Sequence, residues 1–349
     1  MAEIVILGAG VMGSAMSVPA ASAGTDVTLI GTPFDAEIIR SVAGNGWHPR
    51  LGVTLPETVK ACDWTELGTA LARTPDLIVI GVSSAGVGWA VDRLVDALSR
   101  PTPILMITKG LTTDGTAIEV LPTRLQREIQ RRSGFAVPVM AVGGPCIAGE
   151  LAAQRDTSVV ITGDDRDAAS RAFDLLRSSY YHVRFTDDII GVEVCAAFKN
   201  FYAIAVGSVG GRLEKDGKAA NSALMHNLSA STFTQALREM RELTMALGGD
   251  PATVSGLAGV GDLYVTCQAG RNGRMGRLLG LGLPYSRAKS DHMPTDTVEG
   301  ANLALELGSA IEQMIADGRL AAQTIPLTQA IIAAICRDEP LMLDFSRFH

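Results

Sequence analysis

The chain has 349 residues, which is long for one ordinary domain and about right for two. Hydrophobic residues make up 47% of it, enough for sizeable cores, and the net charge of −7 argues against a nucleic-acid-binding protein, which needs a basic face. The five cysteines and five histidines show no metal-binding spacing, and no run of eighteen uncharged apolar residues occurs. We therefore expect a cytoplasmic protein with no metal site and no membrane span.

The first predicted strand leads directly into a glycine-rich turn. Residues 4–7 form an apolar run typical of a parallel strand that is buried on both faces. Gly8, Gly10 and Gly13 follow at the spacing of a dinucleotide-binding fingerprint. Glycine is needed there for a tight turn, for the close approach of a pyrophosphate and for close packing of the next helix.

A helix and a second strand complete this motif. A helix over residues 13–23 would place the amides of Val11 and Met12 at its positive end, facing the phosphates. Residues 27–30 provide the second strand at the right distance. A nucleotide cofactor is therefore a better interpretation than a bare glycine turn. Glu3 and the lack of a positively charged start argue against a signal peptide.

The choice between NAD and NADP stays open at this stage. An NAD enzyme often has Asp or Glu at the end of the second strand, whereas an NADP enzyme has Arg nearby. Here Thr32 follows the strand and is able to bond either a ribose hydroxyl or a 2′-phosphate. Asp35 and Arg40 come later, on a helix that we expect to begin near Asp35.

Further strands and helices alternate up to about residue 187, with a loop over residues 45–56. This alternation predicts an α/β domain of the Rossmann type, with a doubly wound and mostly parallel sheet whose ligands gather at the carboxyl ends of the strands. Lys109 and residues 143–146 lie at such ends. The predicted strands span residues 76–82, 104–108, 137–142, 158–162 and 182–185.

The pattern then changes to apolar residues at helical spacing, with no buried strand from residue 191 onward. We expect a dinucleotide-binding domain over residues 1–188 and an all-helical domain over residues 189–349, with a polar loop at 212–221. The predicted helices span residues 192–209, 225–247, 251–259, 275–279, 298–317 and 326–337.

Two lysines are candidates for chemistry. Lys199 is one charge in a long apolar helical run, so it either extends to the surface or is held in a cleft, where a partly desolvated lysine exchanges protons near neutral pH. Lys109 is either an exposed loop lysine or a ligand-facing one. The residues alone leave both alternatives open.

Residues 256–276 are a second glycine-rich stretch, which suggests close approach to a ligand. Arg271 has a planar fork suited to phosphate, and Thr266 and Asn272 can add hydrogen bonds. Asp262 either orients a lysine or caps a helix in a solvated loop. By contrast, no histidine neighbours the glycine loops in the sequence, and Cys146 and Cys267 are expected to be packed residues.

Together these motifs resemble the soluble NAD(P)-dependent glycerol-3-phosphate dehydrogenases over nearly the whole chain. The resemblance implies an enzyme, a homodimer, that uses NAD or NADP to interconvert dihydroxyacetone phosphate and sn-glycerol 3-phosphate in phospholipid synthesis. The motifs that carry it are Gly8-Ala-Gly-Val-Met-Gly, Thr108-Lys-Gly, Gly144-Pro, Lys199-Asn200, Gly261-Asp262, Arg271-Asn272 and Val298-Glu299-Gly300.

The same resemblance implies residue roles. Lys199 would be the general acid/base at the oxygen on carbon 2, Asp262 would support it, and Lys109 would lie beside the nicotinamide and the reacting oxygen. The substrate would also contact Gly144, Cys146, Asn200, Thr266, Gly270, Arg271 and Asn272. The cofactor would contact Gly8, Gly10, Val11, Met12, Gly13, Thr32, Ala148, Arg271 and Glu299.

Three departures leave the polyol open. Cys146 stands where the family usually has Ser or Thr, and Ser229 and Gln235 replace basic residues on a helix expected near the substrate entrance. Another phosphorylated polyol or ketose is therefore an alternative substrate. A 6-phosphogluconate or β-hydroxyacid dehydrogenase, or a nucleotide sensor without turnover, is a less favoured alternative.

Overall fold

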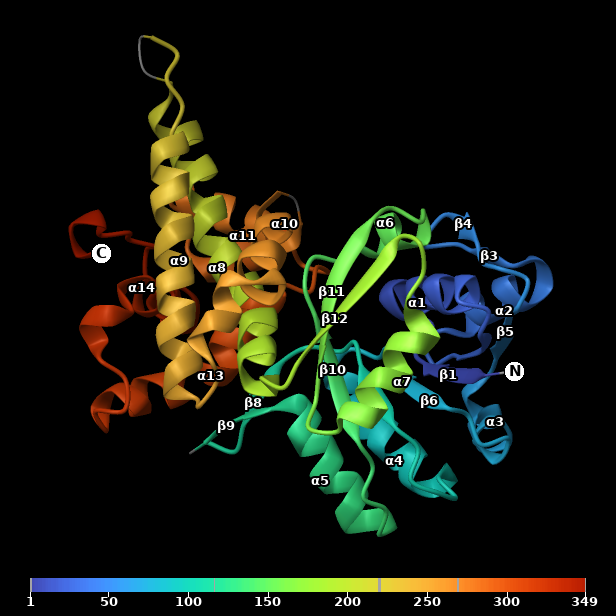
Figure 1. Ribbon diagram of the computed structural model, residues 1–349. Helices are drawn as coiled ribbons and strands as arrows, with labels where there is room; N and C mark the ends of the chain where they lie inside the picture. The colour runs from blue at the N-terminus through green and yellow to red at the C-terminus, as the bar shows by residue number, and fades with distance from the viewer. Residues whose placement is uncertain (1, 116, 219–220, 269, 349) are drawn as a thin grey trace. The chain divides into compact units, whose positions relative to one another are not determined.

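The computed structural model describes residues 2–115, 117–218, 221–268 and 270–348 (Figure 1). Its contacts divide the chain into two compact units. The first combines residues 1–110 with residues 120–189, and the second combines residues 111–119 with residues 190–349. The second unit therefore includes residues 111–119, which lie in the sequence between the two segments of the first unit.

The first unit is built on an eight-stranded sheet in the order β12-β11-β10-β7-β6-β1-β2-β5. Every neighbouring pair is parallel except β10 and β11, which confirms the predicted mostly parallel sheet. The strands are β1 (Glu3–Leu7), β2 (Asp26–Ile30), β5 (Val59–Cys62), β6 (Leu77–Ile80), β7 (Ile104–Met106), β10 (Val139–Gly143), β11 (Thr157–Thr162) and β12 (Tyr181–Thr186).

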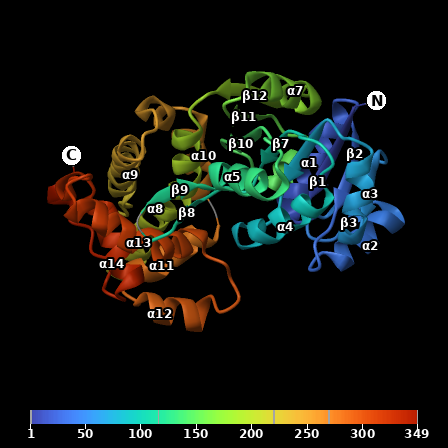
Figure 2. The same ribbon diagram turned by 90° about the horizontal axis from the view of Figure 1, so that it is seen from below.

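Helices cover both faces of this sheet because its central strands are apolar on both sides (Figures 1 and 2). Ile4 and Ile6 of β1 belong to one core, whereas Val5 and Leu7 belong to the other. The first core packs against α1 (Val11–Ser22), α2 (Ala36–Asn45), α6 (Ala148–Ala152) and α7 (Arg166–Leu176). The second packs against α3 (Leu67–Ala72), α4 (Val87–Ala97) and α5 (Leu121–Ser133).

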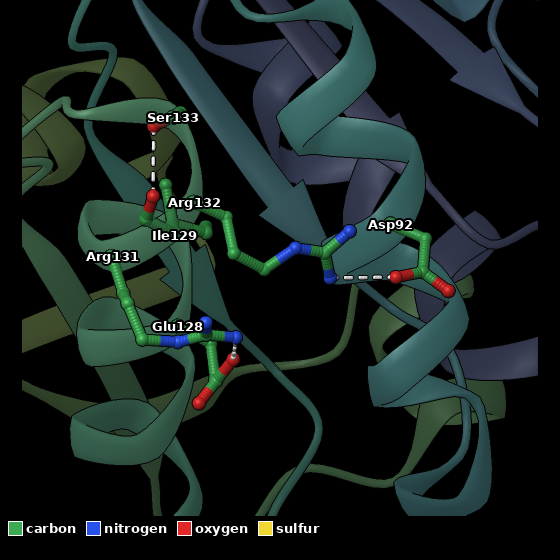
Figure 3. A network of polar contacts seen from close by, with 6 residues as sticks. All are labelled: Asp92, Glu128, Ile129, Arg131, Arg132 and Ser133. Atoms are coloured by element: carbon green, nitrogen blue, oxygen red, sulfur yellow. Dashed lines mark hydrogen bonds and ion pairs between the residues drawn. The ribbon is translucent and has the colours of Figure 1, made fainter.

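Helices α4 and α5 lie side by side and are joined at their surfaces by an ion pair. Figure 3 shows Arg132 of α5 extending to Asp92 of α4, with 2.6 Å between Nη1 and Oδ1. Within α5, Arg131 pairs with Glu128, and the Ser133 hydroxyl donates to the Ile129 carbonyl. Such exposed pairs contribute little stability, so the apolar contacts beneath them hold the two helices together.

One expectation for this unit was wrong. The segment over residues 45–56, expected to be a loop, contains a two-stranded antiparallel hairpin formed by β3 (Trp47–His48) and β4 (Val53–Thr54).

The second unit is helical from residue 190 onward in its described part, as predicted. A hairpin of β8 (Leu111–Thr113) and β9 (Ile118–Val120) joins it, and β8 packs against α13 (Glu299–Ala316). The helices are α8 (Ile189–Asp216), α9 (His226–Ala246), α10 (Asp262–Gln268), α11 (Arg271–Gly280), α12 (Tyr285–Arg287), α13 (Glu299–Ala316) and α14 (Pro326–Cys336).

Two expectations for this unit need correction. Residues 212–216, expected to begin a polar loop, continue α8, whereas residues 219–220 of that loop lie outside the described residues. Residues 251–259 form short 3₁₀- and π-helical turns rather than a continuous α-helix. Within the described residues, α8 is also long and apolar enough to cross a membrane, but 72% of its apolar window is buried inside the protein, as in a core helix.

Helices α8 and α11 touch backbone to backbone through glycines. A Cβ atom at Gly276 would lie 1.9 Å from the Ile204 carbonyl oxygen, and one at Gly280 would lie 2.0 Å from that of Ser208. On α8, a Cβ at Gly211 would lie 1.9 Å from the Arg277 carbonyl oxygen. No side chain larger than hydrogen fits at these positions. The contact places the start of α11 directly beside α8.

We predict that Gly276→Ala destabilises the protein by about 2–3 kcal/mol, because the new methyl group overlaps backbone that has no room to move. The matched control is Gly273→Ala on the same helix, where a Cβ would meet nothing within 4 Å. The control should be neutral or slightly stabilising, since alanine favours the helix. Urea unfolding of both variants checks this, and equal stability of the two would contradict the packing argument.

A buried carboxylate holds the start of α14. Glu239 of α9 accepts hydrogen bonds from the backbone N–H groups of Leu327 and Thr328 at 2.6 Å and from the Thr328 hydroxyl at 2.7 Å. Gln235 donates to it at 2.8 Å and is itself buried. Gln235, one of the two positions at which the family's basic residue is replaced, thus has a side chain that faces the interior. Burial raises the pKa of Glu239 to about 7, against hydrogen bonds that lower it.

This raised pKa predicts a pH-dependent stability. The native state keeps the Glu239 proton up to about pH 7, whereas the unfolded chain loses it near pH 4.5. The stability that this difference adds is therefore fully present below pH 4.5 and is lost as the pH rises through 7. Urea unfolding at pH 5 and pH 8.5 should show a larger loss of stability for the wild type than for Glu239→Gln, which has no such proton. The same pH dependence in both proteins would contradict the prediction.

Candidate functional site

The turn between β1 and α1 has the shape of a phosphate cradle. Gly8 has φ +113°, and a Cβ there would lie 2.7 Å from the Gly81 backbone. A Cβ at Gly13 would lie 2.1 Å from the Gly8 carbonyl oxygen. At Gly10, by contrast, a Cβ would meet nothing within 4 Å. The first and third glycines are therefore required by packing, whereas the second leaves open space over the turn.

The start of α1 is suited to an anion. Gly10 is its N-cap residue, no side chain caps it, and its first turn has no acidic residue. The first amides of a helix, here those of Val11 and Met12, have no acceptor within the helix and lie at its positive end. Open space beside such amides fits the pyrophosphate of a dinucleotide.

Two residues outside the motif hold this turn in place. The Asp35 carboxylate accepts hydrogen bonds from the N–H groups of Ala9 (3.3 Å) and Thr32 (2.9 Å) and from the Thr32 hydroxyl (2.7 Å). Ala9 is also held through its carbonyl group, because His48 Nε2 lies 3.2 Å from the Ala9 carbonyl oxygen. Nδ1 of His48 accepts from the Leu51 N–H, so Nε2 carries the proton and donates.

These contacts show that a histidine neighbours the glycine turn through space, although none does so in the sequence. His48 follows the turn by about forty residues and lies in a segment that was expected to be a loop, so no local signal in the sequence could have found it. Thr32, expected to meet the ribose, has its hydroxyl engaged with Asp35.

The other predicted residues of the first unit follow strand ends. Lys109 comes shortly after β7, where the Thr108 hydroxyl donates to the Val82 carbonyl at 2.6 Å and so ties the ends of β6 and β7 together. Gly144, with φ +115°, follows β10, and Cys146 packs partly buried against the core of the unit. Ala148 begins α6, which packs against α1. Because β1, β6, β7 and β10 are parallel, these residues and the glycine turn share one edge of the sheet.

In the second unit, α8 and α10 bring Lys199 and Asp262 together. The Lys199 ammonium donates to the Asp262 carboxylate in a close ion pair. The side chain of Asp262 is 1% exposed and that of Lys199 is 14% exposed. Lys199 is therefore held in place rather than extended to the surface, and Asp262 is not a cap in a solvated loop. A buried pair with one partly accessible ammonium suits proton exchange with a bound ligand.

A second cluster joins α8, α11 and α13. The Asn272 amide donates to the Asn200 side chain at 2.9 Å, and its oxygen accepts from the Gly300 N–H at 2.9 Å. Arg271 pairs closely with Glu299, and both are about half exposed. Asn272 is thus committed to the protein, whereas Arg271 keeps accessible donors.

The start of α11 is a second place suited to an anion. Gly270 is the N-cap residue at φ +122°, a left-handed conformation that favours glycine, and the first turn has no acidic residue. Thr266 lies one turn after Asp262 on α10 and donates its hydroxyl to the Asp262 carbonyl oxygen. The ammonium, the guanidinium and the helix start all belong to the second unit.

The predicted residues therefore fall into two groups. The first unit holds Gly8, Gly10, Val11, Met12, Gly13, Thr32, Lys109, Gly144, Cys146 and Ala148. The second unit holds Lys199, Asn200, Asp262, Thr266, Gly270, Arg271, Asn272 and Glu299.

Comparisons with known proteins cover both groups. Residues 3–169 match the family model for the N-terminus of NAD-dependent glycerol-3-phosphate dehydrogenase, and residues 188–342 match the model for its C-terminus. The NADP(+)-dependent glycerol-3-phosphate dehydrogenase of Archaeoglobus fulgidus is 34% identical over 90% of this chain and 91% of its own. A glycerol-3-phosphate dehydrogenase [NAD(P)+] of Mycobacterium avium is 32% identical over 88% of this chain and 85% of its own.

A solved structure agrees. Glycerol-3-phosphate dehydrogenase from Coxiella burnetii superposes with a TM-score of 0.78 at 27% identity, covering 97% of this chain and 96% of that one. With both halves of the chain matched in order, the chain belongs to the NAD-dependent glycerol-3-phosphate dehydrogenase family.

Proposed function

We propose that this protein interconverts dihydroxyacetone phosphate and sn-glycerol 3-phosphate with NAD(H) or NADP(H). The observation that carries the proposal is the Lys199 ammonium held by a buried carboxylate in a chain of this family. The cradle at Gly8, Gly10 and Gly13 fits the dinucleotide. When bound, the reduced nicotinamide supplies the hydride for the carbonyl carbon.

Lys199 is proposed to act on the oxygen of that carbonyl. As hydride reaches carbon 2, negative charge develops on the oxygen, and a nearby ammonium both stabilises this charge and delivers a proton. Asp262 is proposed to hold the ammonium in position. Lys109, which follows β7, is proposed to add a second positive charge near the reacting oxygen. In the oxidative direction Lys199 takes the proton back.

The phosphate is proposed to bind at the start of α11. Arg271 offers charge-assisted hydrogen bonds, and the helix start and Gly270 offer backbone N–H groups. Thr266 is proposed to add a hydrogen bond. Binding at this non-reacting group positions the carbonyl carbon. Because the Asn272 amide already bonds Asn200 and Gly300, we propose that it supports the phosphate site by positioning α11 beside Asn200.

Several finer assignments remain predictions. These are the substrate contacts of Gly144 and Cys146, the cofactor contacts of Ala148 and Glu299, the homodimer and the cytoplasmic location. Cys146 and Ser229 still depart from the family pattern. Dihydroxyacetone phosphate is nevertheless the proposed substrate, because the relatives named above are glycerol-3-phosphate dehydrogenases.

We predict that Lys199→Met lowers kcat for dihydroxyacetone phosphate by about 100-fold or more, as expected for the loss of a general acid. The measurement is oxidation of NADH and NADPH by the purified protein, with dinucleotide affinity measured in parallel. Lys215→Met is the matched control, because it removes an ammonium from the exposed end of the same helix. Undiminished turnover in Lys199→Met would remove the assigned acid/base.

Removing the guanidinium of Arg271 should mainly weaken substrate binding. We predict that Arg271→Ala raises KM for dihydroxyacetone phosphate about tenfold or more, since a charge-assisted hydrogen bond contributes about 1.5–3 kcal/mol. Arg274→Ala is the control, because Arg274 lies in the same helix turn but bonds the His292 carbonyl and Asp296. An unchanged KM, or an equal rise in the control, would refute the phosphate role.

A further inference from the structure

A buried hydroxyl group in the described part of the first unit lacks a partner. Tyr181 begins β12 and is 1% exposed, and among the described residues its phenol hydroxyl has no hydrogen-bond partner. The hydroxyl of the neighbouring Tyr180, by contrast, shares a hydrogen bond with the Ser22 hydroxyl at 2.9 Å. Buried polar groups in proteins are nearly always paired, so the Tyr181 hydroxyl calls for an acceptor that the folded chain alone does not supply.

The Cys146 thiol lies near this hydroxyl. The chain leaving β10 runs toward Thr157 at the start of the antiparallel β11, and Thr157 pairs with Tyr181 of β12. Tyr181 and Cys146 also pack into the same apolar core, which places them on one face of the sheet. Burial is the main cause of the raised pKa of Tyr181, and the charge of the Cys146 thiolate is near enough to raise it further.

The other four cysteines are held as thiols. Cys195 is fully buried, and burial raises the pKa of Cys62, of Cys336 and, to about 12, of Cys267. The S–H group of Cys336 also donates a hydrogen bond to a backbone carbonyl at 3.2 Å. Thiols that stay protonated react slowly with oxidants, because the thiolate is the nucleophile.

Cys146 has a different environment. It is partly exposed, and it follows β10 at the sheet edge where the neighbouring parallel strand β7 leads into Lys109. A positive charge at such an edge favours the thiolate. Because the family usually has Ser or Thr at this position, a group that peroxide can oxidise stands here in place of a hydroxyl that it cannot.

We propose that Cys146 is a reversible oxidation site through which peroxide switches the enzyme off, and that Tyr181 holds the oxidised form. The thiolate sulfur attacks one oxygen of hydrogen peroxide, so that an S–O bond forms, the O–O bond breaks and hydroxide leaves with the electron pair of that bond. The sulfur is oxidised to a sulfenic acid and the peroxide is reduced. The new oxygen accepts the hydrogen bond for which the Tyr181 hydroxyl otherwise has no partner.

The effect on activity rests on the proposed function, because Gly144 and Cys146 are predicted to line the substrate's binding edge. An oxygen added to the sulfur takes space from the substrate there. A small thiol reverses the change, since it displaces water from the sulfenic acid to give a mixed disulfide, and a second thiol then releases Cys146.

Peroxide treatment of the purified full chain, followed by dimedone trapping and peptide mass spectrometry, tests the site without turnover. Dimedone should label Cys146 and leave Cys336 unlabelled. Turnover of dihydroxyacetone phosphate by the wild type should fall in step with the label, to a loss of most of the activity, and dithiothreitol should restore it. Cys146→Ser should keep its own untreated activity under the same treatment.

Tyr181→Phe tests the hydrogen bond, because it keeps the buried ring and removes only the hydroxyl. Its sulfenic acid should pass on to sulfinic acid, so dithiothreitol should restore a smaller share of its activity than in the wild type. Tyr180→Phe is the matched control, since that hydroxyl already bonds Ser22, and it should recover as the wild type does. An unchanged melting temperature shows that the Tyr181→Phe core is intact.

Three results would contradict the oxidation site and leave the dehydrogenase function standing: no label on Cys146, full activity of the labelled protein, or an equal fractional loss in Cys146→Ser. Equal recovery of Tyr181→Phe and the wild type would remove the role of Tyr181. If the untreated wild type does not reduce dihydroxyacetone phosphate, the proposed function itself fails, whereas the label on Cys146 and its further oxidation in Tyr181→Phe still test the site by mass.

Discussion

The close approach of α8 and α11 is the constraint on which the second unit's candidate site depends. Glycines at 211, 276 and 280 let the two backbones touch, so that the first turn of α11 lies against the turn of α8 that carries Lys199 and Asn200. The Asn200–Asn272 hydrogen bond then fixes the register between the helices. A proton donor and a phosphate-binding group can act on the same small molecule only if their separation is fixed, and backbone contact fixes it more rigidly than flexible side chains would.

The first unit achieves comparable rigidity with hydrogen bonds. The Ala9 N–H donates a hydrogen bond to Asp35, and the Ala9 carbonyl oxygen accepts one from His48. The glycine turn is therefore fixed before any ligand binds, which lowers the entropy that binding must overcome. Both residues are buried and belong to segments that follow β2 in the sequence, so the turn, the end of β2 and the β3–β4 hairpin form one connected structure.

Much of this architecture could be predicted from the sequence because its signals are local. Apolar runs such as residues 4–7 are long enough to mark buried strands, and Gly8, Gly10 and Gly13 have a spacing that few other structures require. The β3–β4 hairpin escaped prediction because its strands are two residues long and leave no periodic pattern. His48, Gln235 and Glu239 escaped because their partners are distant or buried, and a single polar residue carries no sign of whether it faces a neighbour or solvent. For Lys199 the sequence left two alternatives, and only the position of Asp262, 63 residues later, decides between them.

The path of the chain through the β8–β9 hairpin has a consequence for how the protein can be divided. The polypeptide leaves the first unit after Gly110, packs β8 against α13, and returns at Val120. The N–H of the next residue, Leu121, bonds the Gly110 carbonyl at 3.2 Å. It leaves the first unit again near Ile189. No single cut therefore separates the two halves cleanly. A fragment beginning at residue 190 would lack the β8 strand that packs against α13, and a fragment ending at residue 189 would carry that strand without the helix it packs against.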